Sequence, residues 1–323
     1  MQISLGRPKF ESMKTVKVLA PASVANLVCG FDVLGMALAD PADEMTMSLS
    51  NKPGIRIIHE DAYGLPEAAE KNVAGAALMA MMKELDPSIG FTLRVNKCIK
   101  PGSGLGSSAA SAAGAVAAAN ALLDDKFSTD DLVRFAMSGE KLASGVKHAD
   151  NIAPCLYGGI TLIRAIHPLD IVRLSFPDLY VTVVHPQIEV KTSDARQILR
   201  KQVLLKDAIR QWGNIAGLVA GFMQKDYDLI GRSLEDVIIE PVRSILIPGF
   251  DDVKTRCLEA GALGGGISGS GPSVFMLSVE ERTAQRVREV MEDVYGSLGI
   301  DYKIYVTRID EKGVKINEVL QHQ

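Results

Sequence analysis

The sequence has few cysteines and few aromatic residues, and it has no long uninterrupted apolar run. Its four cysteines are scattered, with no C-x-x-C pair and no Cys/His cluster at metal-ligand spacing, which argues against a zinc site or a disulfide framework. The alanine-rich run at 109–123 is too short and too weakly hydrophobic to span a membrane. The amino terminus lacks the apolar core of a signal peptide. We therefore expect a cytoplasmic protein with no membrane partner.

The chain also lacks any block of five or six like charges, and its 35 basic and 39 acidic side chains give a net charge of −4. This balance argues against nucleic acid as a partner. With 323 residues, of which 47% are hydrophobic, the chain can bury a sizeable core in two domains. We expect these domains to span residues 13–185 and 186–323.

The hydrophobic patterning predicts strands and helices without a regular βαβα alternation, which favours two α+β domains. The wet face of the strand at 91–99 favours an antiparallel sheet. Pro21 is expected to end the first strand, and Asn72 to cap the first helix. The predicted strands lie at 15–19, 45–49, 55–59, 91–99, 158–166, 274–279 and 302–308, and the predicted helices at 72–85, 107–123, 129–145, 193–224, 226–238, 251–260 and 282–297.

A glycine-rich turn, "KPGSGLGSSAASAAG" at residues 100–114, stands between a strand and a helix. In this arrangement backbone N–H groups and the positive end of a helix dipole converge on an anion, and serine hydroxyls add donors or a Mg²⁺ ligand. A tight turn with a serine cap is the simpler alternative. A Walker loop is excluded because no lysine follows the glycines. A dinucleotide fingerprint fits only superficially, because Asp124 and Asp125 end the same helix and the preceding strand alternates.

The string P-G-S-G-L-G-S-S-A-A-S closely resembles the phosphate loop of the GHMP kinases, the superfamily of galactose, homoserine, mevalonate and phosphomevalonate kinases. Further segments resemble homoserine kinases in particular, and they occur in the order of that family. They are "APASVANLVCGFDVLG" (20–35), "KHADNIAP" (147–154), "VKTSDAR" (190–196), "IIEPVR" (238–243) and "GGGISGSGPSVF" (264–275).

The resemblance implies a two-domain GHMP kinase fold and an ATP- and Mg²⁺-dependent transfer of phosphate to the hydroxyl of L-homoserine. The product would be O-phospho-L-homoserine, used in threonine synthesis. The first domain would hold a mixed or antiparallel sheet with helices, similar to the second domain of a ribosomal small-subunit protein. The second would be a ferredoxin-like α/β plait. Family members also suggest a homodimer.

The nucleotide site implied by the family is the phosphate loop with its flanks. Ser108 and Glu140 would hold Mg²⁺, which needs oxygen ligands. Asn72 matches the position that contacts adenine, although helix capping alone would also explain it. The residues assigned to the nucleotide are Asn72, Lys100, Pro101, Gly102, Ser103, Gly104, Leu105, Gly106, Ser107, Ser108, Ala109 and Ala110.

Homoserine is a zwitterion with a hydroxyl, so its pocket needs an anion, a cation and polar groups. By resemblance, Asn26 and Asp32 would take the ammonium, and Arg196 and Arg243 the carboxylate. His148, Asp150 and Asn151 would lie near the reacting hydroxyl.

We assign Asp150 and Asn151 to orienting this hydroxyl, with base catalysis by Asp150 as the weaker option. The catalytic set is completed by Ser108 and Glu140. Two alternatives remain open: another GHMP kinase acting on a different small alcohol, and a GHMP-fold binding or regulatory protein without activity.

Overall fold

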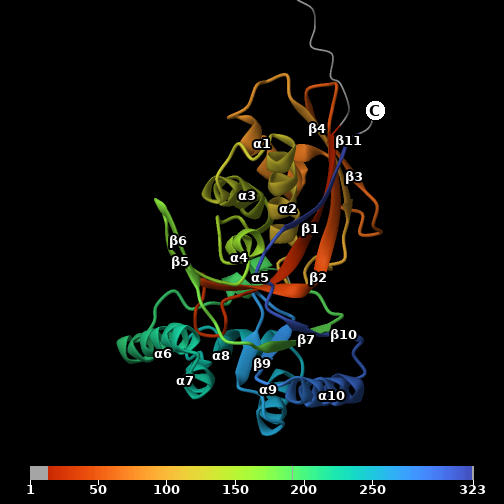
Figure 1. Ribbon diagram of the computed structural model, residues 1–323. Coiled ribbons are helices and arrows are strands. Elements are labelled where there is room, and N and C mark those ends of the chain that lie inside the picture. Colours follow the sequence, from red (N-terminus) through yellow and green to blue (C-terminus); the bar gives the residue numbers. More distant parts are fainter. Residues whose placement is uncertain (1–13, 191, 322–323) are drawn as a thin grey trace, which may run out of the picture.

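The computed structural model describes residues 14–190 and 192–321, which form an upper and a lower lobe (Figure 1). Residue 13, the predicted start of the first domain, lies outside the described residues. The upper lobe is built on a mixed sheet in which β11, β1, β2, β4 and β3 lie side by side, while β5 pairs with β2 and β6 with β5. Its strands are β1 (Lys14–Ala25), β2 (Leu34–Leu49), β3 (Gly54–His59), β4 (Gly90–Asn96), β5 (Ile160–Ile166), β6 (Leu169–Leu174) and β11 (Lys315–Gln321).

The first strand differs from its prediction, because Pro21 does not end it. β1 runs on to Ala25, and its register against β2 shifts between Pro21 and Ser23. Such an irregularity accommodates a residue that has no N–H to donate to the ladder. The other edge of β1 pairs with β11, a strand that the patterning did not predict. The predicted antiparallel pairing of β4 is confirmed with β2, but β4 pairs in parallel with β3.

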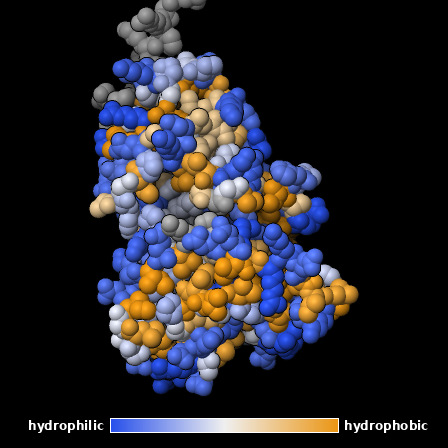
Figure 2. Space-filling model, turned by 180° about the vertical axis from the view of Figure 1, so that it is seen from behind, coloured by the Kyte–Doolittle hydropathy of each residue, from blue (hydrophilic) through white to orange (hydrophobic). Residues whose placement is uncertain are grey.

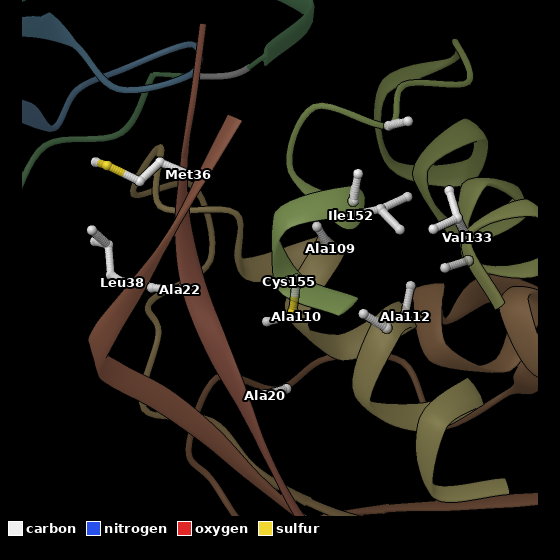
Figure 3. Packing of buried hydrophobic residues seen from close by; sticks show 14 of the residues in the cluster. Ala20, Ala22, Met36, Leu38, Ala109, Ala110, Ala112, Val133, Ile152 and Cys155 are labelled. Atoms are coloured by element: carbon white, nitrogen blue, oxygen red, sulfur yellow. The ribbon is translucent and has the colours of Figure 1, made fainter. Parts of the chain in front are cut away.

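The helices of the upper lobe cover one face of this sheet (Figure 1). Helix α2, which follows the glycine turn, is buried around almost its whole circumference, because alanine side chains let neighbouring elements approach it closely. Figure 3 shows Ala109, Ala110 and Ala112 of this helix among side chains of β1, β2, α3 and α4. The helices are α1 (Val73–Met82), α2 (Ser107–Leu122), α3 (Thr129–Ser144) and α4 (Ile152–Tyr157), with a short 3-10 helix η1 (Ala69–Lys71) before α1.

The lower lobe holds an antiparallel sheet in the order β10, β7, β9, β8. Helices α9 and α10 pack on it around a second hydrophobic core. Its strands are β7 (Tyr180–Pro186), β8 (Gly264–Ile267), β9 (Val274–Ser278) and β10 (Tyr302–Arg308). Its helices are α5 (Thr192–Gln197), α6 (Leu205–Gln224), α7 (Tyr227–Ser233), α8 (Glu240–Arg243), α9 (Phe250–Glu259) and α10 (Glu281–Leu298), with a 3-10 helix η2 (Ser244–Leu246).

Two of the predicted helices are wrong in extent. The helix predicted at 193–224 is interrupted between α5 and α6, although the connecting residues contain neither glycine nor proline. Tertiary contacts decide here, because α5 places Arg196 against Asp32 whereas α6 packs against α7. The helix predicted at 226–238 stops at Ser233, because the carboxylate of Asp236 accepts the backbone N–H groups of Ile238 and Ile239 at 2.8 and 3.0 Å and starts a new turn.

The chain passes between the two lobes more than once. It enters the smaller sheet of the lower lobe with β7, and it returns with β11 to the larger sheet of the upper lobe. The division at residue 185/186 remains a prediction. Within the described residues, no helix is long and apolar enough to cross a membrane. Viewed from behind, hydrophobic residues at the surface are most extensive over the lower part of the molecule (Figure 2).

Candidate active site

A cavity of about 310 Å³ lies where the two lobes meet. Its walls come from the segments that carry the sequence motifs, although these are far apart in the chain. Among the described residues, the predicted residues that line it are Asn26, Asp32, Pro101, Gly102, Ser103, Gly104, Gly106, Ser107, Ser108, Glu140, His148, Asp150, Asn151, Arg196 and Arg243. The predicted residues Asn72, Lys100, Leu105, Ala109 and Ala110 do not line it.

The phosphate loop, residues Gly102–Ser108, forms one end of the cavity. Gly104 and Gly106 have φ of 80° and 67°, which favour glycine. A Cβ on Gly104 would lie 2.7 Å from the carbonyl oxygens of Ser268 and Gly271, so the loop packs tightly on a second glycine loop, residues 268–273. The hydroxyl of Ser268 also donates to the carbonyl of Gly104 at 2.7 Å. The second loop therefore holds the first in shape.

The serines that end the phosphate loop have different partners. Ser107 donates its hydroxyl to the carbonyl of Ile99 at 2.8 Å, so it helps to close the turn. The Ser108 hydroxyl lies 2.9 and 3.1 Å from the two carboxylate oxygens of Glu140 and donates to this group. Burial raises the pKa of Glu140, while the hydrogen bond from Ser108 lowers it. A carboxylate and a hydroxyl that meet beside a phosphate loop fit the oxygen ligands that Mg²⁺ takes.

Charged side chains gather at the other end of the cavity. Arg196 on α5 donates to both carboxylate oxygens of Asp32, at 2.9 and 3.2 Å. Arg243 on α8 is 3% exposed and donates to the backbone carbonyls of Ala195 and Gly269, both at 3.0 Å. Both guanidinium groups lie over the ring of Phe31, 5.4 and 4.9 Å from its centroid. Within the described chain no carboxylate pairs with Arg243.

Burial shifts the pKa values of two side chains at this end of the cavity, Arg243 and His148. Burial and the neighbouring Arg196 lower the pKa of Arg243 to about 10, so this side chain stays a cation at neutral pH. Burial lowers the pKa of His148, with smaller effects from both arginines, although Asp32 acts in the opposite direction. His148 Nδ1 lies 3.5 Å from Asp32 Oδ1. This end of the cavity thus holds two guanidinium groups, and the carboxylate of Asp32 pairs with one of them.

Asp150 lies between the two ends, two residues before α4. Its side chain is buried, and this burial, with the charges of Asp32 and Glu140, raises its pKa to about 7. The next residue, Asn151, accepts a hydrogen bond from the hydroxyl of Ser23 at 2.8 Å. Two buried nitrogens beside them, His148 Nε2 and Arg196 Nε, have no hydrogen-bond partner among the described residues. Unpaired buried donors and acceptors of this kind are costly unless a ligand satisfies them.

Three of the predicted residues are engaged in holding the structure. Asn26 donates to the carbonyl of Gly269 at 2.8 Å and accepts from the N–H of Asp32 at 3.1 Å, so it fixes the loop that carries Asp32. Asn72 caps α1, as predicted, by accepting from the N–H of Ala74 at 2.9 Å. Lys100 donates to the side chain of Gln187 at 3.0 Å. The ligand roles assigned to them remain predictions.

Sequence reasoning missed some of the residues that line the cavity. Phe31 stands within a quoted motif, but an aromatic residue there carried no signal of its contacts with two distant arginines. Ser270 was within the second glycine motif, which could have suggested it. Lys97 directly follows β4, before the phosphate loop, and lines the cavity. Nothing in the local sequence distinguished Lys97 from Lys100, the lysine that was assigned to the nucleotide.

Comparison with known families and structures agrees with this geometry. The family model described as GHMP kinases N terminal domain matches residues 72–159, and GHMP kinases C terminal matches residues 218–297. Together they cover more than half of the chain. The first match includes the phosphate loop, Glu140 and Asp150, and the second includes Arg243 and the second glycine loop.

Relatives align over nearly the whole chain. A homoserine kinase of Chloroherpeton thalassium is 45% identical over 94% of this chain and 100% of its own length. One of Chlorobium phaeobacteroides is 42% identical over the same shares. The crystal structure of homoserine kinase from Cytophaga hutchinsonii superimposes with a TM-score of 0.91 at 48% identity, covering 97% of this chain and 100% of that one.

Proposed function

This chain belongs to the homoserine kinases of the GHMP kinase family, and we propose that its cavity transfers the terminal phosphate of ATP to the hydroxyl of L-homoserine. The phosphate loop binds the triphosphate, and the charged end binds the amino acid. The product, O-phospho-L-homoserine, is the one expected from the family resemblance. The role of each residue below is part of the same proposal.

The observation that carries the choice of acceptor is the buried cation Arg243, whose hydrogen bonds all go to backbone carbonyls. A guanidinium that is 3% exposed requires an anion nearby, and the carboxylate of an amino acid supplies one. Asp32, within reach of the same space, offers a partner to the ammonium. When the zwitterion binds, Asp32 and Arg196 would therefore no longer pair with each other: Asp32 would pair with its ammonium group and Arg196 with its carboxylate. Galactose has neither charge and mevalonate has no ammonium, so both would leave part of this set unpaired.

The reaction itself is a displacement at phosphorus. The hydroxyl oxygen of homoserine bonds to the γ-phosphorus, the bond from this phosphorus to the bridging oxygen breaks, and ADP leaves with the electron pair. Asp150 and Asn151 orient the hydroxyl. With a pKa of about 7, Asp150 is also able to accept the hydroxyl proton, which otherwise passes to the transferred phosphate. Positioning and charge neutralisation supply most of the catalysis in such transfers.

Magnesium is the cofactor that the donor set fits, and Ser108 and Glu140 would hold it. When bound, it neutralises negative charge on the phosphate oxygens. A Glu140 carboxylate whose pKa is raised by burial gains from a nearby cation, which favours its charged form. The hydroxyl of Ser108 already points at this carboxylate, so the two groups need little rearrangement.

The experiment that tests the function is a coupled ADP-release assay with Mg·ATP and L-homoserine, with mevalonate, galactose, shikimate and L-serine as parallel acceptors. We expect turnover with homoserine and at most about 1% of its kcat/KM with the others, which corresponds to nearly 3 kcal/mol of discrimination. Turnover with another alcohol would keep the phosphate loop and overturn the assignments of Asp32, Arg196 and Arg243. Binding of ATP without turnover of any acceptor would favour the regulatory alternative.

We also propose that the chain forms a homodimer, as the family resemblance suggests. Three large apolar side chains, Leu205, Ile209 and Trp212, are 67%, 56% and 60% exposed on α6. Their spacing of four and three residues places them on one face of the helix. Light scattering coupled to size-exclusion chromatography measures the mass directly, and a monomer at micromolar concentration would contradict the proposal. A cytoplasmic location likewise remains a prediction.

A further inference from the structure

A buried ion pair lies directly beneath the phosphate loop, and neither partner was part of the predicted site. It joins Lys97, the residue after β4, to Asp43 in β2, and their side chains are only 2% and 0% exposed. The ammonium group of Lys97 donates to the carboxylate of Asp43, to the hydroxyl of Ser111 at 2.7 Å and to the carbonyl of Ser107 at 3.1 Å. Lys97 thereby uses all three of its N–H donors.

The same network reaches the chain on the other side of the loop. The second carboxylate oxygen of Asp43 accepts the backbone N–H groups of Cys98 and Ile99, both at 2.9 Å. Ser107 donates its hydroxyl back to the carbonyl of Ile99. The segment that enters the phosphate loop and the helix that leaves it are thus tied to one buried pair.

Stability alone is a poor explanation for such a pair. Two charges taken out of water lose hydration that their mutual attraction only partly returns, and apolar residues of similar size often serve a core equally well. What the pair does provide is geometry, because it fixes the distance between Ile99 and the first turn of α2. The backbone N–H groups of the loop between them can bind an anion well only if they are held in place before it arrives.

We propose that Lys97 and Asp43 are positioning residues for the nucleotide, which hold the two ends of the phosphate loop at the span that a triphosphate requires. The inference rests on the proposed function only in that the ligand of the loop is ATP. Lys97 also lines the cavity, so a cation stands close to the phosphate site in a loop that has no lysine after its glycines.

The test compares Lys97→Met with the double variant Asp43→Asn/Lys97→Met. The single variant leaves a buried carboxylate unpaired, so we expect a lower Tm and nucleotide binding weakened about tenfold or more. In the double variant the carboxylate charge is gone, and the Asn oxygen still accepts from Cys98 and Ile99. We expect its Tm to recover, but its affinity for a non-hydrolysable ATP analogue, measured by calorimetry, to stay about tenfold weaker. The KM for homoserine should stay within about twofold of that of the parent protein.

Lys254→Met is the matched control, because it breaks another lysine–carboxylate pair, with Glu240 in the lower lobe. We expect it to lower the Tm without changing the affinity for the analogue. Recovery of both Tm and affinity in the double variant would overturn the inference, and so would an equal rise in the KM values of both substrates. Failure of the proposed function would be a separate result. If the parent protein binds the analogue but does not phosphorylate homoserine, the proposed acceptor is wrong. The comparison of the variants by calorimetry still decides the role of Lys97.

Discussion

At the nucleotide end of the cavity, residues Gly102–Ser108 follow one another in the chain, whereas the acceptor end takes side chains from four separate segments. We propose that the first end binds through backbone N–H groups of a single turn. The second depends on Asp32, His148, Arg196 and Arg243 being brought together by the fold. A single substitution should therefore act differently at the two ends.

The supporting contacts differ in the same way. The phosphate loop rests on other backbone, as the contact between Gly104 and the second glycine loop shows. At the acceptor end, two backbone carbonyls hold Arg243 and the carboxylate of Asp32 holds Arg196, and both guanidinium groups lie over the ring of Phe31. We therefore expect that removing a side chain from the acceptor end leaves the nucleotide site intact, and that this separation is measured as independent KM values.

The largest expected effect is at the nucleotide end, where Glu140→Gln keeps the shape of the side chain and removes its charge. We expect kcat to fall on the order of 10³-fold and the Mg²⁺ concentration needed for half-maximal activity to rise, because a neutral amide is a poor ligand for a hard cation. Steady-state kinetics at several Mg²⁺ concentrations measure both. Glu289→Gln, at an exposed position on α10, is the control and should behave like the parent protein. Turnover of Glu140→Gln within about threefold of the parent would remove Glu140 from the proposed metal site.

At the acceptor end, Arg243→Leu should raise the KM for homoserine about a hundredfold and leave the KM for ATP nearly unchanged. Loss of a buried charge-assisted pair costs about 2 to 4 kcal/mol, which corresponds to this factor. Arg200→Leu, which removes an exposed arginine, should change neither value. Equal losses for both substrates in Arg243→Leu would show that the two ends are not independent.

The same contrast explains what the sequence could reveal. The phosphate loop, the cap at Asn72 and the helix that carries Glu140 were predictable, because each depends on residues close together in the chain. The arginines were identified only by resemblance to family motifs, since an isolated arginine has no local signature. Phe31 and Lys97 were missed because their contacts, with α5 and α8 and with β2, exist only after folding.

The fold shows the same limit. The irregularity that carries β1 past Pro21 depends on the register of β1 against β2. The pairing of β11 with β1 joins residues as far apart in the chain as Leu19 and Lys315, which no local pattern reports. The break between α5 and α6 could not be predicted from the sequence, because the connecting residues contain no glycine or proline. It places Arg196 at the cavity while α6 packs elsewhere, so this departure from the predicted helix is also what completes the acceptor end.

Asp150, which lies between the two ends, offers the smallest of the three effects, and it is seen in stability. Its pKa of about 7 exceeds the value of about 3.9 in an unfolded chain, so the folded protein binds this proton more tightly between these pH values. The stability that the protonated group contributes is therefore complete below about pH 4 and is lost as the pH rises through 7. Complete burial of the charge would give a ceiling of about 4 kcal/mol, and because Asp150 lines a cavity that solvent can enter, we expect about half of this, about 2 kcal/mol.

Asp150→Asn should consequently be more stable than the parent protein by about 2 kcal/mol at pH 8, and this difference should shrink towards zero as the pH falls to 4. Urea unfolding at a series of pH values measures it, and comparing two variants cancels the titration of the other carboxylates. Asp125→Asn, at an exposed position with a φ of 55° that asparagine tolerates, should show no such trend. A constant difference between Asp150→Asn and the parent across this range would mean that Asp150 is charged in the empty cavity at neutral pH. In that case the hydroxyl would be oriented by a carboxylate already able to take its proton.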